Sequence, residues 1–229
     1  MDARAGQAEL ILARLDTLPT LPAIASRLLE ISGDDQVDLR EISAMIEAEE
    51  EGDKLTIDEL IANCVLLMFA GNETTTNLVG NGMLALLQNR KQLGMLKGDA
   101  ELIGPAVEEL LRYDSPVQKT ARMAMVEIEI GGKVIKAGDL VMLCYGSANR
   151  DPEQFENPNR LDIVRTDNRH LAFAQGIHYC LGAALARMEG QIAIKTLLKR
   201  MPDIKLADGP IERYPTTHIW GLKPLPVSF

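Results

Sequence analysis

The chain has 229 residues, of which 46% are hydrophobic and 25% charged, ordinary proportions for a globular protein with a sizeable core. Its formal net charge of -9 argues against a nucleic-acid partner, because nucleic acids are bound by basic surfaces. Three widely separated cysteines, Cys64, Cys144 and Cys180, suggest neither a disulfide framework nor a zinc site and favour a reducing cytoplasm. We expect no membrane association, because the sequence shows neither a run of about 18 apolar residues nor an apolar leader.

Residues 1–47 have the pattern of a small separate helical piece. The sequence predicts helices over residues 8–15, 22–32 and 38–46, separated by prolines and a glycine. The charged run at residues 49–54 is the expected boundary to the second part, residues 48–229. The first piece resembles the opening helices of an HDOD domain, a bacterial signalling module, over residues 13–47. A generic amphipathic helical hairpin is the alternative.

A long apolar helix is predicted from a capping box at Thr56 to about residue 87. Its middle contains Gly71, Glu73 and Thr74, although glycine and threonine are costly inside a helix and can open its hydrogen-bond ladder. We therefore expect a functional reason for them. The alternative is that Gly71 permits close helix packing and that the Thr74 hydroxyl bonds to a backbone carbonyl.

A second helix is predicted from Pro105 to Tyr113. Glu109 and Arg112 lie on one face of it, three residues apart. An exposed pair at this spacing contributes only about 0.2–0.5 kcal/mol, so the spacing by itself assigns no role.

Residues 119–145 change to a strand pattern. Residues 126–130 alternate, Gly131 and Gly132 supply a tight turn to residues 133–135, and residues 140–145 form an apolar strand. A closing hairpin is predicted over residues 216–227.

Residues 171–190 place Cys180 between a glycine-bearing loop and an alanine-rich helix. The unpaired N–H groups and positive dipole end of that helix favour a thiolate, the form of cysteine that binds metals. Gly176 and Gly182 lack a Cβ, so a flat ligand can approach the backbone closely. A buried structural cysteine is the alternative, but it gives no reason for the glycines or for Phe173.

The order Phe-x-x-Gly-x-His-x-Cys-x-Gly at residues 173–182 resembles the cysteine loop of haem-thiolate monooxygenases, the cytochrome P-450 family. The resemblance extends from residue 48 to residue 229. It implies the C-terminal half of that fold, an α+β fold that is mainly α, preceded by a small helical N-terminal appendage. The implied cofactor is haem b, iron protoporphyrin IX, with Cys180 as the thiolate ligand of the iron.

The resemblance also implies roles for the neighbours of Cys180 and for Arg122. Phe173, Gly176 and Gly182 belong to the haem-binding loop, and His178 and Arg122 match residues that hold haem propionates. An ordinary, partly buried histidine and a solvated arginine at a strand edge are the alternatives.

Residues of the two predicted helices acquire roles in the same way. Glu73 and Thr74 match the acid–alcohol pair that guides protons to dioxygen. Glu109 and Arg112 match the Glu-x-x-Arg element of the family, and Arg160 is the expected third member of a buried structural network behind the haem.

The implied activity is insertion of one atom of dioxygen into a small organic substrate. Electrons would come from NAD(P)H through a ferredoxin or flavodoxin. The long helix predicted from Thr56 to about residue 87 resembles the oxygen-binding helix of the family, which we call the distal helix. The first half of the fold is missing from the resemblance, so we expect this helix to be exposed and the chain to self-associate through it. One alternative is a truncated or fused, non-catalytic chain that binds haem weakly or not at all. The other is an HDOD-like signalling fragment.

Overall fold

The computed structural model describes residues 57–229, and the helices expected within residues 1–47 lie outside the described residues. The chain divides within its first described helix, between Phe69 and Ala70, and the packing below concerns Ala70–Phe229. The elements, in chain order, are α4 (Ile57–Gln88), α5 (Arg90–Gly98), η1 (Ala100–Leu102), α6 (Ile103–Tyr113), β1 (Thr120–Met123), β2 (Ile128–Ile130), β3 (Lys133–Ile135), β4 (Leu140–Leu143), α7 (Tyr145–Ala148), η2 (Gly176–His178), α8 (Ala183–Arg200), β5 (Lys205–Leu206) and β6 (Val227–Ser228). The expected α+β, mainly α, class is therefore confirmed.

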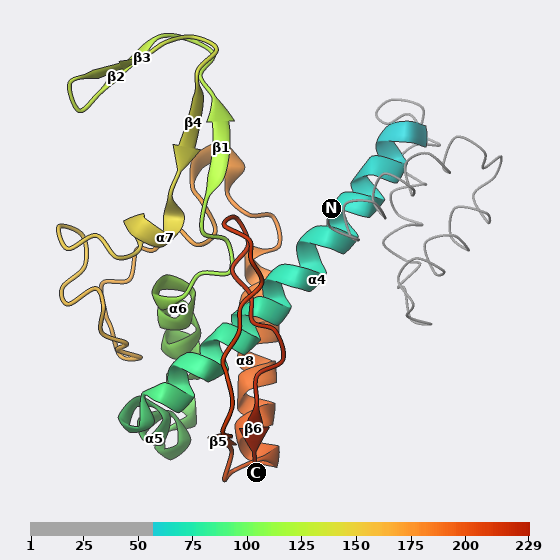
Figure 1. Ribbon diagram of the computed structural model, residues 1–229, viewed down its shortest axis with the longest axis vertical. Helices are drawn as coiled ribbons and strands as arrows, with labels where there is room; N and C mark the ends of the chain where they lie inside the picture. Colours follow the sequence, from blue (N-terminus) through green and yellow to red (C-terminus); the bar gives the residue numbers. More distant parts are fainter. Residues whose placement is uncertain (1–56) are drawn as a thin grey trace. The chain divides into compact units, whose positions relative to one another are not determined.

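Helix α4 is continuous over 32 residues (Figure 1). The predicted long helix is confirmed, with its C-terminal end within one residue of the prediction, and Ile57, its first residue, is also the first described residue of the chain. Gly71 and the threonines after it do not interrupt the α-helix. No helix in the described range is long and apolar enough to cross a membrane.

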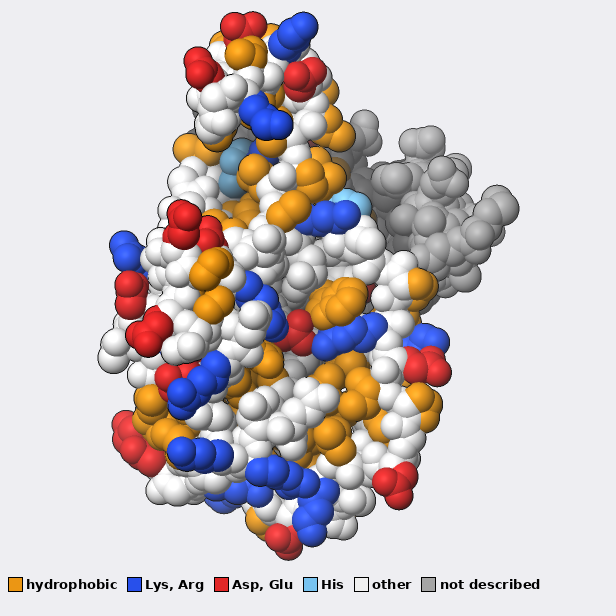
Figure 2. Space-filling model, turned by 60° about the vertical axis from the view of Figure 1, so that its left-hand side comes forward, with side chains coloured by type: hydrophobic (Ala, Val, Ile, Leu, Met, Phe, Trp, Pro, Cys, Tyr) orange, Lys and Arg blue, Asp and Glu red, His pale blue; other side chains and the backbone are white. Residues whose placement is uncertain are grey.

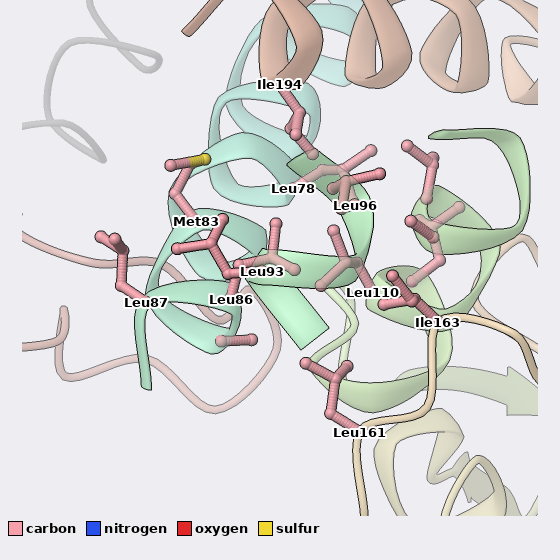
Figure 3. Packing of buried hydrophobic residues seen from close by; sticks show 14 of the residues in the cluster. Leu78, Met83, Leu86, Leu87, Leu93, Leu96, Leu110, Leu161, Ile163 and Ile194 are labelled. Carbon is pink, nitrogen blue, oxygen red and sulfur yellow. The ribbon is translucent and has the colours of Figure 1, made fainter. Parts of the chain in front are cut away.

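The core lies where the second half of α4 meets α5, α6 and α8. Figure 3 shows leucines of α4, α5 and α6 facing one another, with Ile194 of α8 beside Leu78. Leu86, Val107 and Ile194 are fully buried, and each such side chain contributes about 1.5–3 kcal/mol relative to an exposed one. Close approach is also required at Gly190 of α8, where an added Cβ would lie 3.0 Å from Leu78 Cδ2.

Strands β1, β2, β3 and β4 form a long arm, residues 120–143, which we call the β arm (Figure 1). Strand β1 pairs antiparallel with β4, and β2 pairs antiparallel with β3. Gly131 and Gly132 have φ values of 58° and 72°, as a two-residue hairpin turn between β2 and β3 requires. The predicted hairpin is confirmed, whereas the predicted strand over residues 140–145 ends at Leu143 because Tyr145 begins α7.

Many apolar side chains of the β arm face solvent. Figure 2 shows hydrophobic side chains over the projecting upper part of the molecule. The exposed apolar residues of the arm are Met123, Met125, Val126, Ile128, Ile130, Val134, Leu140, Met142 and Leu143. Neighbouring strand residues such as Met142 and Leu143 point to opposite faces, so both faces of the arm are exposed within the described part of the chain.

The C-terminal segment folds into a short hairpin, but its bounds differ from the predicted residues 216–227. Arg213 pairs antiparallel with Leu222, and the Lys223 N–H donates to the Glu212 carbonyl at 2.9 Å.

The connection between the two sides of this hairpin contacts another part of the chain. The Trp220 N–H donates to the Pro116 carbonyl at 2.7 Å, and the Gln118 N–H donates to the His218 carbonyl at 2.8 Å. The segment therefore pairs with the chain that follows α6. Its end returns as β6, which pairs with β5.

Candidate functional site

Cys180 lies in the loop before α8, three residues ahead of the first helical residue, Ala183. Its N–H donates to the Phe173 carbonyl at 2.9 Å, and its carbonyl accepts the Ala183 N–H at 3.2 Å. The thiol is free and the residue is exposed. The alternative of a buried structural cysteine is therefore wrong for Cys180.

Two residues with positive φ shape this cysteine loop, residues 171–182. Ala174 has φ 57° and Gly176 has φ 67°. The first is uncommon for a residue with a side chain, and the second suits glycine. A Cβ built on Gly176 or on Gly182 would meet no described atom within 4 Å. The space beside both glycines is thus open, as expected for backbone that a flat ligand approaches.

The cysteine loop carries side chains suited to haem. Ile177 is 97% exposed and Leu181 is 93% exposed, so two large apolar side chains flank the thiol without a protein partner among the described residues. Haem combines an apolar macrocycle with an iron that accepts a thiolate ligand. A free exposed thiol, open glycine backbone and exposed apolar neighbours together fit this group. His178, the predicted propionate partner, is also exposed in this loop.

A cluster of side chains that was not predicted from the sequence contacts the cysteine loop. Glu108 of α6 accepts two hydrogen bonds from Arg187 of α8, from Nε at 2.7 Å and from Nη2 at 3.0 Å. The His170 Nε2 lies 3.1 Å from the same carboxylate. The Arg187 guanidinium also lies 4.6 Å from the centre of the Phe173 ring and donates to the Tyr179 hydroxyl at 3.0 Å. We call Glu108, His170, Phe173, Tyr179 and Arg187 the Glu108 cluster.

Electrostatics make Glu108 a carboxylate across a wide pH range. Burial by itself would raise the pKa of Glu108, but hydrogen bonds from His170 and Arg187 outweigh burial and lower this pKa to about 2. The same ion pair raises the pKa of Arg187. The His170 Nδ1 accepts the Ala172 N–H at 3.2 Å, so the ring proton belongs on Nε2, facing Glu108.

The Glu-x-x-Arg pair forms a second, fully buried network on α6. Both side chains are 0% exposed, and Arg112 donates to Glu109 from Nε at 2.8 Å and from Nη2 at 2.9 Å. The third guanidinium is that of Arg165, whose Nε lies 3.1 Å from Glu109. The prediction of the Arg160 side chain in this position is wrong. Arg160 is exposed and reaches the network only through its carbonyl, which accepts from Arg112 and Arg165.

The predicted acid–alcohol pair lies near the middle of α4. Glu73 and Thr74 are both half-buried, and the Thr74 hydroxyl donates to the Ala70 carbonyl at 2.7 Å. A Cβ on Gly71 would meet no described atom within 4 Å, so no described helix packs closely against this glycine, whereas the Thr74 bond to a backbone carbonyl is the one that the alternative expected. The next residue, Thr75, donates to Glu189 of α8 at 3.0 Å. This contact joins α4 to the helix that follows Cys180.

Arg122 lies on β1, half-buried. Its Nη1 donates to Thr120 Oγ1 at 3.2 Å and to the Ala121 carbonyl at 2.8 Å. These local contacts leave the propionate role of Arg122 a prediction.

Comparison with known proteins agrees with the fold and with the cysteine loop. The model of the family described as "Cytochrome P450" matches residues 22–101 and 98–202. The chain belongs to this family. The match begins inside the segment that resembles an HDOD domain, so the HDOD resemblance gains no support.

Several bacterial members are similar to the chain. The polyketide biosynthesis cytochrome P450 PksS of Bacillus subtilis is 53% identical over 190 residues, 82% of this chain and 47% of that protein. The solved structure of P450BioI in complex with a hexadecenoic-acid-ligated acyl carrier protein is 45% identical, with a TM-score of 0.75, over 96% of this chain and 51% of that chain. The tirandamycin C-bound monooxygenase TamI is 42% identical, with a TM-score of 0.80, over 89% of this chain and 51% of that chain. The chain spans about half the length of these relatives.

Proposed function

We propose that this chain binds haem b through the Cys180 thiolate and forms the thiolate-ligand half of a bacterial cytochrome P450 monooxygenase. The observation that carries the proposal is the cysteine loop. Its backbone is fixed by the Cys180 N–H and the Phe173 carbonyl, while the thiol stays free and exposed between two solvent-facing apolar side chains.

Bound haem supplies the chemistry that inserts one atom of dioxygen into a small organic substrate. Cys180 would contribute the ligand, and His178 and Arg122 would hold the propionates. Glu73 and Thr74 would move protons toward the reacting oxygen. Electrons come from NAD(P)H through a ferredoxin or flavodoxin in the cytoplasm.

Absorption spectroscopy of the reduced, carbon-monoxide-treated chain tests the proposal. A thiolate ligand gives a strongly red-shifted Soret band, so the parent chain and Cys144→Ser should both show this band after haem is added. Cys144 is the matched control because it is another exposed, free cysteine. Cys180→Ser should lose the band. A band that survives Cys180→Ser, or one that is absent from the parent, would overturn the proposal.

The second candidate function is a non-catalytic chain that binds haem weakly. It is favoured by the exposed apolar residues of the β arm and by Leu66 and Phe69 of α4, which are 61% and 63% exposed. An exposed apolar surface promotes self-association, and an open haem site admits water. On this hypothesis the 229-residue chain should hold less than one haem per chain and should sediment as oligomers. Full haem loading in a monomer would contradict this candidate.

A further inference from the structure

The Glu108 cluster connects three parts of the chain that are far apart in sequence. Glu108 comes from α6, Arg187 from the second turn of α8, and His170 from the irregular segment before the cysteine loop. The Arg187 side chain is 30% exposed and that of His170 is 3% exposed. The cluster is therefore built partly inside the protein and differs from a solvated surface ion pair.

The guanidinium of Arg187 contacts the cysteine loop on both sides of Gly176. It stacks on Phe173, seven residues before Cys180, and it donates to Tyr179, the residue directly before Cys180. Phe173 and Tyr179 also contact each other, with ring centres 6.5 Å apart in an edge-to-face arrangement. One planar cation thus holds both ends of the turn that presents the thiol.

Glu108 fixes the plane of this guanidinium. A carboxylate that accepts from Nε and Nη2 together allows one orientation of the arginine fork, whereas a single hydrogen bond allows rotation. The His170 Nε2–H, facing Glu108 Oε2, restrains the carboxylate in turn. The ring of His170 also lies 6.0 Å from that of Phe173.

We propose that Glu108 is a positioning residue for the cysteine ligand: through Arg187 it holds Phe173 and Tyr179, and so fixes the direction in which Cys180 presents its thiol. The hydrogen bonds and ring contacts of Glu108 and Arg187 are to His170, Phe173, Tyr179 and each other, so Glu108 and Arg187 act on Cys180 through these residues. The effect on haem rests on the proposed function, whereas the effect on the loop does not.

Amide hydrogen exchange of the haem-free chain tests the loop directly. Three N–H groups of the loop are hydrogen-bonded within it, those of Ala174, Tyr179 and Cys180. In Glu108→Gln the neutral amide cannot accept from both nitrogens of Arg187 and also from His170. We expect these three N–H groups to exchange about tenfold faster or more, while amides of α5 keep their rates. Arg187→Lys keeps the positive charge but lacks the planar fork, so we expect an intermediate acceleration.

Glu212→Gln is the matched control. Glu212 also accepts a hydrogen bond from a cation, Lys223, at 2.6 Å, but it lies in the C-terminal segment. Its replacement should leave exchange in the cysteine loop unchanged. Unchanged exchange in Glu108→Gln, or equal acceleration in α5, would overturn the proposal.

Haem-loaded protein provides the second readout. After reduction and carbon monoxide treatment, the share of absorbance in the thiolate band should fall in Glu108→Gln relative to the parent and should stay unchanged in Glu212→Gln. A parent without any thiolate band, combined with faster loop exchange in Glu108→Gln, would refute the proposed function and support the positioning of the loop. A thiolate share equal to that of the parent in Glu108→Gln would refute the effect on the ligand.

Discussion

Replacement of Glu109 by glutamine perturbs a fully buried charged pair of the described chain, Glu109 and Arg112. Glu109 accepts five hydrogen bonds, two from Arg112 and one each from Arg165, Asn168 and the Asp162 N–H. All five groups donate to the two carboxylate oxygens, so the NH2 group of a glutamine side chain would face donors in place of acceptors. The glutamine is also neutral. Glu109→Gln therefore leaves the fully buried guanidinium of Arg112 without its counter-charge.

The magnitude follows from this burial. Removal of one partner of a buried ion pair costs about 3–5 kcal/mol of the free energy of unfolding. For a chain of this size, 1 kcal/mol shifts Tm by about 2–4 °C, so we expect Glu109→Gln to lower Tm by about 6–20 °C. Arg165→Met removes a charged hydrogen bond from a side chain that is 10% exposed and should cost about 1.5–3 kcal/mol. Arg160→Ala should change the free energy of unfolding by less than about 0.5 kcal/mol, because only the Arg160 carbonyl takes part.

Thermal and urea unfolding, followed by the helical circular dichroism signal, measure all three variants against the parent chain. Arg165→Met and Arg160→Ala are a matched pair, since each removes an arginine from the same irregular segment. The reasoning is refuted if Arg160→Ala costs as much as Arg165→Met. A loss below about 1 kcal/mol in Glu109→Gln would equally show that the buried ion pair is not what holds this segment.

Three further predictions address the contact between α4 and α8 at Gly190, the effect of acid, and the distal helix. Gly190→Val should lower the free energy of unfolding by about 1–3 kcal/mol in urea titration, because its Cβ would lie 3.0 Å from Leu78; an unchanged midpoint would contradict this contact. The pKa of Glu108 is about 2 in the folded chain, and its ordinary value is 4.5. The contribution of the ionised Glu108 to the free energy of unfolding is therefore complete above about pH 4.5 and is lost as pH falls toward 2. Allowing for solvent screening, we expect the parent chain to lose about 1 kcal/mol of its free energy of unfolding between neutral pH and pH 3, and Glu108→Gln to lack this loss. Equal acid sensitivity of the two proteins would rule this out. Thr74→Ala should keep haem content but release more hydrogen peroxide per NAD(P)H, because a hydroxyl that orients a proton donor is gone; product yield per NAD(P)H equal to that of the parent would exclude the role.

Local signals in the sequence predicted the long helix and the hairpin. The capping box and the apolar run define α4, and the two adjacent glycines define the turn between β2 and β3. Each of these sequence signals sets the local backbone conformation over a few residues and does not depend on contacts with residues far along the chain. Helix α5 was missed because it has nine residues and contains Gly94, and because Asn89, the residue before its start at Arg90, makes no side-chain cap.

The two charged networks depended on distant contacts, which one sequence does not define. Glu108 meets His170 across 62 residues and Arg187 across 79 residues. Arg160 and Arg165 lie five residues apart in an irregular segment, where no helical or strand period sets the direction of a side chain. The resemblance therefore pointed to Arg160 as the third arginine, whereas the path of the backbone brings Arg165 to Glu109.

We expect the β arm to unfold separately from the helical body of the chain. Its two sheets have two strands each, and such ribbons are marginally stable in water unless a packed face supports them. Heat or denaturant should loosen the arm while the helices around Leu86 are still intact. An unfolding transition followed by the helical circular dichroism signal therefore reports the helical body and not the arm. A single two-state free energy of unfolding then does not apply to the whole chain.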